Sequence, residues 1–391
     1  MAGVYPWPSD DGYRLRLANT VEAFRENGEV DFAYFTAQVR SELVPPPDGI
    51  RLMCGGAEVV PRIGRVRAWA GGDRPRSLYR YDMTAGNASV AEQLADHYDL
   101  VYYSHLTSWF LHRLHVDAPS IVDLDNLDHI VNHAARTNAP ATRHWRVWAK
   151  WLAQQPVEWI DERRMARLEH ECSLDARAVT LCSELDAERS GMSNVVVIGN
   201  GYDRTGEPPA GRSGSTLLFV GSLDYTPNAD AVRWFANDVL PLVRLEVPDV
   251  TFRVVGSGGE ALSDVAGVEG VTLAGRVDDL QPELDAAAIA VIPIRFGSGT
   301  RLKVVEALAN RLPMVSTTLG SEGLGVVDGT HALLADDAKS MASACVRLLR
   351  DPQEARHLAN EGETLWDEHY RWGPIRAELA ELGRRVARGG I

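Results

Sequence analysis

The hydrophobic positions divide the second half of the chain into short apolar runs separated by longer amphipathic ones. The clearest run, 289–294, is short, apolar and β-branched, which is typical of a parallel strand covered on both faces. In the segments between these runs, such as 228–245 and 281–287, the apolar positions recur at helical spacing. Strands that alternate with helices in this way predict a doubly wound parallel sheet. The predicted strands are 217–221, 251–255, 271–273 and 289–294.

The sequence FGSGTRLK follows the last of these strands and has the chemistry of an anion site. Its glycines permit close approach of backbone to ligand, and Thr300 is a suitable N-cap for the helix that follows. A helix N-terminus is electropositive and offers unpaired N–H groups, so it suits a phosphate. Arg301 and Lys303 add cations where the helix dipole favours acids, which indicates a bound anion. The alternative is a surface helix with two solvated cations.

Three further loops follow predicted strands and should gather at the same rim. They are GSLDYTPN at 221–228, GSGG at 256–259 and AGRVDD at 274–279. Ligands of doubly wound sheets bind beyond the carboxyl ends of the strands. The four loops together therefore predict one binding site.

The first half shows the same rhythm less clearly. It begins with a very short strand within Met1–Tyr5, followed by the turn-rich PWPSDDG. We expect helices at 12–24 and 90–97. Residues 45–72 give weak signals. The expected strands are 30–35, 100–103, 120–124, 178–182 and 195–198.

Residues 140–175 differ from their surroundings because four tryptophans lie among arginines and lysine. The pattern predicts two helices separated near Pro156. The pair could simply pack its indoles on the domain. Alternatively, it could form an acceptor-binding wall or a membrane-surface face, since interfacial helices combine Trp with Arg and Lys.

The segment RTGEPPAGRSGS at 204–215 has the composition of a linker. We therefore expect an N-terminal domain at 1–203, including the Trp-rich segment, and a C-terminal domain at 216–352. Residues 353–391 are expected to form closing helices that cross back to the N-terminal domain.

Composition narrows the class of protein. The chain has 391 residues, 45% of them hydrophobic, and a formal net charge of −14. This charge argues against nucleic acid as a partner. We see neither a spanning helix nor a signal peptide. Scattered Cys54, Cys172, Cys182 and Cys345 favour reduced thiols in a cytoplasmic protein over a disulfide or zinc site.

The motifs of the second half, in order and spacing, resemble the C-terminal domain of the family 4 retaining glycosyltransferases. These enzymes have two Rossmann-like domains facing across a cleft, the GT-B architecture. The resemblance covers about 195–352. It rests on FVGSLDYTPNADAVRWFANDVLP, FRVVGSGG, VTLAGRVDDL, VIPIRFGSGTRLKVVEALANRLPMVSTTLGSEGL and LLRDP. IGNGYD is similar to the interdomain turn, and PWPSDDGYRLR to the N-terminal glycine loop.

The resemblance implies a role for each residue of the predicted rim. Arg301 and Lys303 would neutralise the diphosphate of a nucleotide-sugar donor, and Glu306 would accept hydrogen bonds from the ribose. Gly221 and Ser222 would pass close to the phosphates. Amides of the glycine loop would help, and the loop after the third strand would hold the base. The residues of these two loops are Gly297, Ser298, Gly299 and Thr300, and Arg276 and Val277.

Three departures from the family pattern follow. Ser298 occupies the first position of the E-x7-E pair that ends at Glu306. The Arg and Lys of the first C-terminal loop are absent from SLDYTPN. The family's N-terminal His falls near Asp125 and Asn126, so Asp125 and His129 become the catalytic candidates, with His105 as an outsider. Asp11, Gly12 and His105 are expected on the acceptor side.

The resemblance implies sugar transfer to a hydroxyl acceptor with retention of anomeric configuration. Fixed cations and helix amides stabilise a leaving diphosphate without a metal, so we expect neither metal nor cofactor. We take DLD at 123–125 as a coincidental match to metal-binding D-x-D patterns. A non-catalytic nucleotide-sugar-binding module remains an alternative, and an epimerase or phosphorylase a lesser one. Peripheral contact with the inner face of the membrane is compatible with the Trp/Arg segment.

Overall fold

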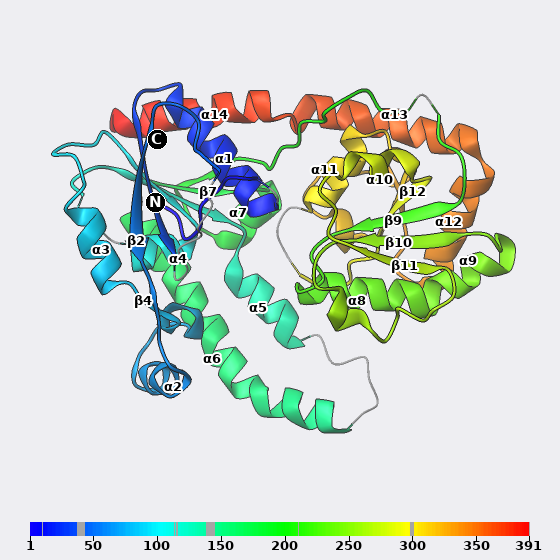
Figure 1. Cartoon of the computed structure of the whole chain (residues 1–391), viewed down its shortest axis with the longest axis horizontal. Coiled ribbons are helices and arrows are strands. Elements are labelled where there is room, and N and C mark those ends of the chain that lie inside the picture. The colour runs from blue at the N-terminus through cyan, green and yellow to red at the C-terminus, as the bar shows by residue number, and fades with distance from the viewer. Residues whose placement is uncertain are drawn as a thin grey trace. The chain divides into compact units, whose positions relative to one another are not determined.

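The computed structural model describes residues 1–9, 11–36, 44–112, 114, 116–137, 145–209, 211–297 and 301–390. The chain forms two compact units (Figure 1). Unit 1 comprises Met1–Gly199 and Gly373–Ile391, and unit 2 comprises Asn200–Trp372.

Unit 2 contains a six-stranded sheet in the order β11-β10-β9-β12-β13-β14, with every pairing parallel. The chain order reverses between β9 and β12, which makes their carboxyl ends the switch point where doubly wound sheets bind ligands. The strands are β9 (Thr216–Val220), β10 (Thr251–Val255), β11 (Val271–Gly275), β12 (Ile289–Ile292), β13 (Met314–Ser316) and β14 (Leu333–Leu334).

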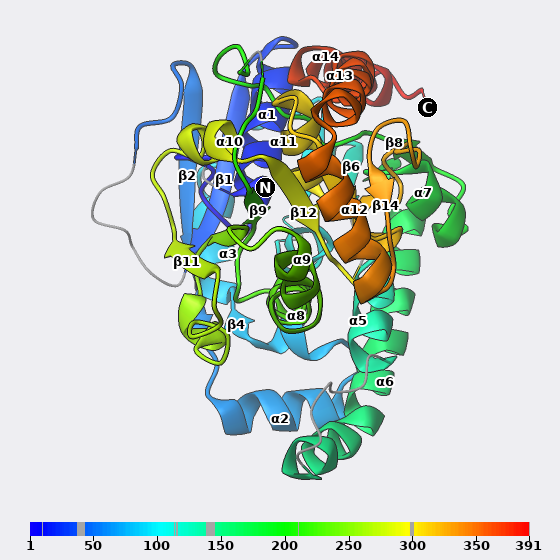
Figure 2. The same ribbon diagram turned by 90° about the vertical axis from the view of Figure 1, so that its right-hand side faces the viewer.

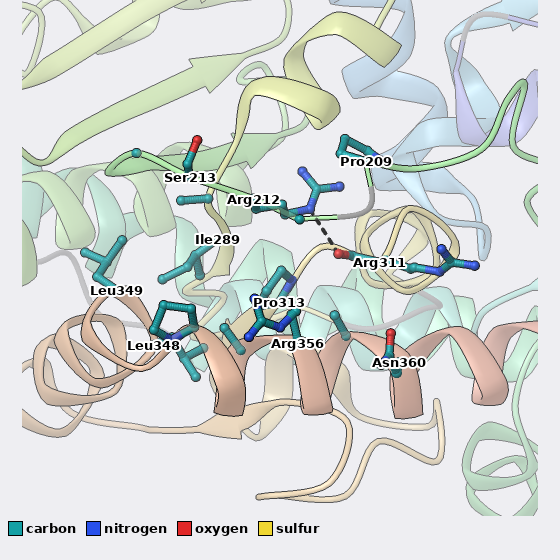
Figure 3. Close-up of a pocket in the computed structure, with 16 residues that line it drawn as sticks. Pro209, Arg212, Ser213, Ile289, Arg311, Pro313, Leu348, Leu349, Arg356 and Asn360 are labelled. Carbon is teal, nitrogen blue, oxygen red and sulfur yellow. Dashed lines mark hydrogen bonds between the residues drawn. The ribbon is translucent and has the colours of Figure 1, made fainter.

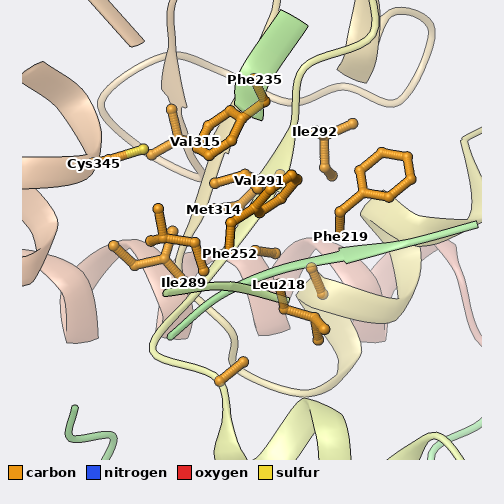
Figure 4. Packing of buried hydrophobic residues seen from close by; sticks show 14 of the residues in the cluster. Leu218, Phe219, Phe235, Phe252, Ile289, Val291, Ile292, Met314, Val315 and Cys345 are labelled. Carbon is orange, nitrogen blue, oxygen red and sulfur yellow. The ribbon is translucent and has the colours of Figure 1, made fainter. Parts of the chain in front are cut away.

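The core of unit 2 lies between this sheet and its helices. Phe219, Phe252 and Val291 of the strands are fully buried and pack with helical side chains such as Phe235 (Figure 4). The rings of Phe235 and Phe252 are 4.5 Å apart. The helices are α8 (Thr226–Trp234), α9 (Leu240–Glu246), α10 (Gln281–Ala286), α11 (Leu302–Ala309), α12 (Ala338–Arg350) and α13 (Pro352–His369), with short 3-10 turns at Gly259–Leu262 and Leu319–Ser321.

The helix expected at 228–245 is interrupted by one wide π turn, η2 (Phe235–Val239). Leu240 N–H donates to Phe235 O, five residues back. Pro241 follows at once and has no N–H to donate. The wide turn therefore lies where the regular hydrogen-bond ladder cannot continue.

Unit 1 is built on a second parallel sheet, in which β1 (Val30–Thr36) pairs with β2 (Ile50–Gly56). The other four strands, in the order β5-β6-β7-β8, are β5 (Val101–Ser104), β6 (Ser120–Asp125), β7 (Ala178–Leu181) and β8 (Val195–Val197). Ala2 connects the two groups through parallel bridges to Tyr34 and Ser104. The strand expected within Met1–Tyr5 is thus reduced to this single residue.

Helix α1 (Gly12–Arg25) packs on helix α14 (Trp372–Ala387): Arg376 Nη1 donates to Asn19 Oδ1 at 3.2 Å. The helix expected at 90–97 was misplaced. Helix α3 runs Thr84–Ala91, and the Asp82 carboxylate accepts from the Thr84 N–H at its start. The remaining elements are the antiparallel strand pair β3 (Glu58–Val59) and β4 (Tyr81–Asp82), α2 (Arg62–Gly71), a 3-10 turn (Arg76–Tyr79), α4 (Leu106–Leu111), α5 (Asp128–Thr137), α6 (Trp145–Asp175) and α7 (Glu184–Ser190) (Figure 2).

The prediction of two helices separated near Pro156 was wrong. Helix α6 is a single helix of 31 residues with Pro156 inside it. A proline leaves the carbonyl four residues earlier without its helical donor. That carbonyl belongs to Leu152, whose residue is 57% exposed, so water can replace the lost donor.

The segment expected to be a linker lies in unit 2, where arginines fasten its described residues. Arg204 pairs with Glu363 at 2.5 Å. The Arg212 guanidinium donates to the carbonyls of Arg311, Asn310 and Ala287 (Figure 3). Burial lowers the pKa of Arg212 to about 10. Carbonyl oxygens thus hold this side chain at the amino ends of β9, β12 and β13.

Candidate functional site

The predicted rim of unit 2 is a set of loops joined by backbone hydrogen bonds. Gly221 N–H donates to Val255 O at 2.9 Å, and Gly256 N–H donates to Gly275 O at 2.9 Å. A Cβ on Gly256 would lie only 2.0 Å from the Gly221 carbonyl oxygen. The loops after β9, β10 and β11 therefore converge as expected, and glycine is what allows them to touch.

The helix start differs from expectation. Helix α11 begins at Leu302, and Arg301 is its N-cap, with non-helical φ −84° and ψ 86°. The expected contacts of Ser298, Gly299 and Thr300 fall outside the described residues. Arg301 is not a solvated surface cation, because its residue is only 8% exposed.

Arg301 lies against the loop that follows β9. A Cβ on Gly297 would be 3.3 Å from an Arg301 guanidinium nitrogen and 3.3 Å from both Pro227 and the Tyr225 hydroxyl. Gly297 therefore lies close both to this cation and to the loop after β9.

Lys303 is the centre of the rim. Its Nζ donates to Asn228 Oδ1 at 2.9 Å and lies 5.0 Å from the centre of the Phe219 ring. Asn228 Nδ2 in turn donates to Ser222 O at 2.7 Å. A Cβ on Gly221 would be 3.3 Å from Nζ. Lys303 thus joins α11 to the ends of β9 and α8.

Burial and the charge of Arg301 lower the pKa of Lys303 to about 7, although Glu306 opposes the shift. Burial also raises the pKa of Glu306 to about 7, with Lys303 acting against it. Two half-buried groups of opposite charge therefore titrate near neutral pH at one edge of the sheet. Perturbed pKa values of this kind are typical of functional sites.

Tyr202 and Asn310 border Glu306 and were not anticipated from the sequence. Burial raises the pKa of Tyr202 to about 12, with a contribution from the charge of Glu306 and an opposing hydrogen bond from Asn310. Asn228 was also missed as a functional residue. Its position just after Pro227 at the start of α8 was the available signal.

The remaining expected donor contacts lie farther out on the rim. Arg276 is exposed in the loop after β11, and Val277 is half-buried against the core. Ser222 Oγ lies 3.5 Å from Ser257 Oγ, between the loops after β9 and β10.

In unit 1, two non-glycine residues with positive φ stand at the carboxyl ends of neighbouring strands. His105 after β5 has φ 76°, and Asp125 at the end of β6 has φ 62°. The His105 N–H donates to Asp123 O at 2.7 Å. Side chains other than glycine rarely adopt this backbone region, and strain of this kind gathers at active sites.

The buried ion pair between Arg16 and Asp123 lies beside the Asp125 carboxylate. Arg16 makes a two-pronged pair with Asp123, at 2.7 and 2.8 Å, and its Nε is 3.8 Å from Asp125 Oδ1. Burial alone would raise the pKa of Asp123, but the charge and hydrogen bonds of Arg16 outweigh it and lower that pKa. Thr180 donates to the same carboxylate at 2.7 Å, and Cys182 Sγ lies 2.8 Å from Asp125 Oδ1. This network was not foreseen, since its members are far apart in the chain.

Asp11 and Gly12 mark the start of α1, where Asp11 is the N-cap and accepts from Arg14 N–H at 2.8 Å. The Tyr13 hydroxyl receives a 3.1 Å hydrogen bond from Ser104 Oγ, and its ring is 6.3 Å from that of His105. The structure therefore brings the start of α1 and His105 to one place.

His129 is committed to a carboxylate. Its backbone N–H donates to Glu169 Oε1 at 3.0 Å, and its Nδ1 contacts Glu169 Oε2. That hydrogen bond raises the pKa of His129, and burial raises the pKa of Glu169. Glu169 is 1% exposed. His105 has a looser partner, since its Nε2 lies 3.7 Å from Asp128 Oδ2.

No group of three or more potential metal ligands occurs among the described residues. The four cysteines are free thiols; Cys172, Cys182 and Cys345 are buried, and Cys54 is exposed. No helix in the described ranges combines the length and apolar character needed to cross a bilayer.

Residues 214–351 match the family model described as Glycosyl transferases group 1. Among curated proteins, a phosphatidyl-myo-inositol mannosyltransferase from Propionibacterium freudenreichii is 28% identical over 200 residues, which are 48% of this chain and 50% of the relative. The chain spans about half or less of the length of the curated relatives it matches.

Solved structures match over nearly the whole chain. A sucrose-phosphate synthase from Thermosynechococcus elongatus has a TM-score of 0.71 at 19% identity, covering 97% of this chain and 94% of the other. HepE from Anabaena, solved with UDP and glucose, has a TM-score of 0.63 at 14% identity and covers 97% of both chains. The chain has the GT-B fold, with two Rossmann-like domains.

Proposed function

We propose that the chain is a glycosyltransferase that moves a sugar from a nucleotide-diphosphate sugar to a hydroxyl acceptor, with retention of anomeric configuration and without a metal. Unit 2 would bind the donor and unit 1 the acceptor. Support for sugar transfer comes from the family match of residues 214–351 and from the fold. Retention rests on the resemblance of the second half to retaining enzymes.

The observation that carries the proposal is the position of Lys303. Its Nζ lies at the switch point of the unit 2 sheet, close to Asn228 and the Gly221 backbone. Buried Arg301 supplies a second positive charge nearby. A diphosphate at this place would meet two cations and would restore the charge that burial takes from Lys303. Glu306, one turn along α11, is suitably placed to accept from ribose hydroxyls.

Fixed cations can stabilise a leaving diphosphate. Negative charge develops on the phosphate as the bond to the sugar breaks, and cations held in place stabilise it without reorganising. No step in this scheme requires a metal. The acceptor hydroxyl must also lose a proton, for which Asp125 or the departing phosphate is available.

Asp125 is the better catalytic candidate of unit 1. Its backbone is strained at the end of β6, and Arg16 and Cys182 hold its carboxylate in place. The Nδ1 of His129 already contacts the Glu169 carboxylate, so we propose a structural role for His129. We propose His105, Asp11 and Gly12 as the acceptor-side edge, because Tyr13 links α1 to His105.

We propose a cytoplasmic location, which agrees with four free cysteines of which three are buried. Nucleic acid is not among the proposed partners, since the formal net charge is −14.

The first test is thermal stabilisation by UDP, GDP and dTDP at equal concentration, followed by release of nucleoside diphosphate from a panel of sugar donors. Lys303→Met should lose the stabilisation, whereas Lys339→Met should keep it. Lys339 is the matched control because it is also the second residue of its helix, α12, and is exposed.

Binding without any release of nucleoside diphosphate, with acceptors of several classes present, would favour the non-catalytic alternative. Ser298 motivates it, because an acid is absent where related enzymes contact the sugar. Release that needs free phosphate instead of an acceptor would indicate a phosphorylase.

A further inference from the structure

Unit 1 exposes a row of large apolar side chains on the N-terminal half of α6. Trp145 is 69% exposed and Leu152 57%, and Trp148 and Trp159 are also exposed. The spacings of three, four and seven residues place all four on one stripe of the helix. Large side chains of this kind are normally buried, so a continuous exposed stripe indicates a surface that binds something.

Helix α2 adds a second apolar edge. It has no buried residue, and Ile63 and Val66, three positions apart, are 69% and 57% exposed. Both helices extend away from the sheet of unit 1 toward the same end (Figures 1 and 2). Trp69 Nε1 donates to Asp161 Oδ1 at 2.7 Å, which anchors α2 on α6. The two helices that carry these apolar edges are therefore joined to each other at one end of unit 1.

The charge of this surface is opposite to that of the chain. Residues 62–71 and 145–157 carry five cations and no Asp or Glu, in a chain with formal net charge −14. The first acids beyond 157, Glu158 and Asp161, are paired with Arg76. The cations are Arg62, Arg65, Arg67, Arg146 and Lys150.

Cations also lie over the indoles. The Arg146 guanidinium is 5.6 Å from the centre of the Trp145 ring, and Arg163 is 3.9 Å from that of Trp159. Indoles at the boundary between apolar and polar groups, with Arg and Lys beside them, are what interfacial helices present to a bilayer. Anionic headgroups would match the positive charge.

We propose that α2 and the first half of α6 form a docking face for an anionic membrane surface. The tryptophans and Ile63 enter the headgroup boundary, and the five cations pair with lipid phosphates. The proposal concerns unit 1 alone and does not depend on the sugar-transfer function.

The test is co-sedimentation of the full chain with vesicles of phosphatidylcholine and phosphatidylglycerol, compared with vesicles of phosphatidylcholine alone. Wild type should bind the anionic vesicles and release at raised salt. Trp145→Ser/Leu152→Ser/Trp159→Ser and, separately, Ile63→Ser/Val66→Ser should each lower partitioning by about tenfold or more. Arg62→Gln/Arg65→Gln/Arg67→Gln should remove the preference for phosphatidylglycerol.

Leu245→Ser/Val327→Ser is the matched control, because these unit 2 side chains are 80% and 54% exposed, and it should bind vesicles like wild type. An unchanged unfolding temperature of each variant shows that the fold is kept. Absence of binding by wild type, or equal binding by all variants, would overturn the proposal. A second result would also overturn it: light scattering without lipid that finds wild type as a dimer and the Trp variant as a monomer. The face would then bind a second copy of the chain.

Discussion

Lys303 Nζ and Asn228 Oδ1 are 2.9 Å apart, and this hydrogen bond joins two helix starts across the switch point of the unit 2 sheet. An amide oxygen is a weaker partner for an ammonium group than a carboxylate or a phosphate. The lysine is therefore held in place while its charge remains poorly compensated, as its pKa of about 7 reflects. A site of this kind is prepared for an anion that arrives later.

Replacing Lys303 should separate stability from binding. The lowered pKa means that folding disfavours the charged amine, and this cost is full below pH 7 and disappears as the pH approaches 10.5. Lys303→Met should therefore melt at a higher temperature than wild type at neutral or lower pH when no ligand is present. It should also lose stabilisation by the nucleoside diphosphate. Calorimetry with and without UDP measures both effects. A lower melting temperature for the ligand-free variant would contradict the assignment.

Donor affinity should depend on alkaline pH through the same amine. Between pH 7 and pH 9 the free protein increasingly lacks the Lys303 proton, while a terminal phosphate is already fully ionised. The dissociation constant for UDP should rise with pH, by up to about tenfold per unit. Lys303→Arg keeps its charge throughout and should flatten the profile. Titration calorimetry at several pH values gives the comparison, and a rise of equal slope in both proteins would remove Lys303 as its cause.

The GSGG loop offers a matched pair of glycines. A Cβ on Gly256 would lie 2.0 Å from the Gly221 carbonyl oxygen, whereas a Cβ on Gly259 would meet nothing within 4 Å. Gly256→Ala should lower the free energy of unfolding by about 1–3 kcal/mol and weaken UDP binding, because the Gly221 backbone must move. Gly259→Ala should be neutral in both respects. Denaturant unfolding of the two variants is the measurement, and equal costs would mean that the loops do not touch as described.

Asp125→Asn tests the base of unit 1. Asn tolerates the left-handed backbone of this position, so folding should be kept. Loss of the carboxylate should lower kcat by about a hundredfold or more, with UDP affinity unchanged because the proposed donor site is in unit 2. Exposed Asp117→Asn is the control. Turnover at the wild-type rate by the Asp125→Asn variant would assign proton removal to the donor phosphate.

The sequence predicted the second half better than the first for a physical reason. Strands β9 and β12 are covered on both faces and so read as continuous apolar runs. Loop glycines also mark the close approaches that follow them. Helix α2 has no fully buried residue and β3 has two residues, so neither leaves a periodic signal.

Tertiary pairing accounts for most of what was missed. Arg16 and Asp123 are 107 positions apart, and nothing local in either segment announces their ion pair. Arg301 was expected to be a cation that binds an anion, but its burial depends on how the chain folds around Gly297 and could not be seen locally. Pro156 wrongly predicted a break between two helices. On an exposed helix, water can donate to the carbonyl that proline leaves without a helical donor.

The chain enters and leaves unit 2 at neighbouring points. Tyr202 N–H donates to Tyr370 O at 2.8 Å, and Trp372 N–H donates to Asp203 Oδ1 at 3.1 Å. Because residues 200–372 are uninterrupted in sequence and hydrogen bonds join their two ends, a single gene fragment encodes the whole of unit 2. Under the proposed function, exchanging this fragment for its counterpart from a GT-B glycosyltransferase, cut at the equivalent positions, would replace the donor specificity and leave the rest of the polypeptide unchanged.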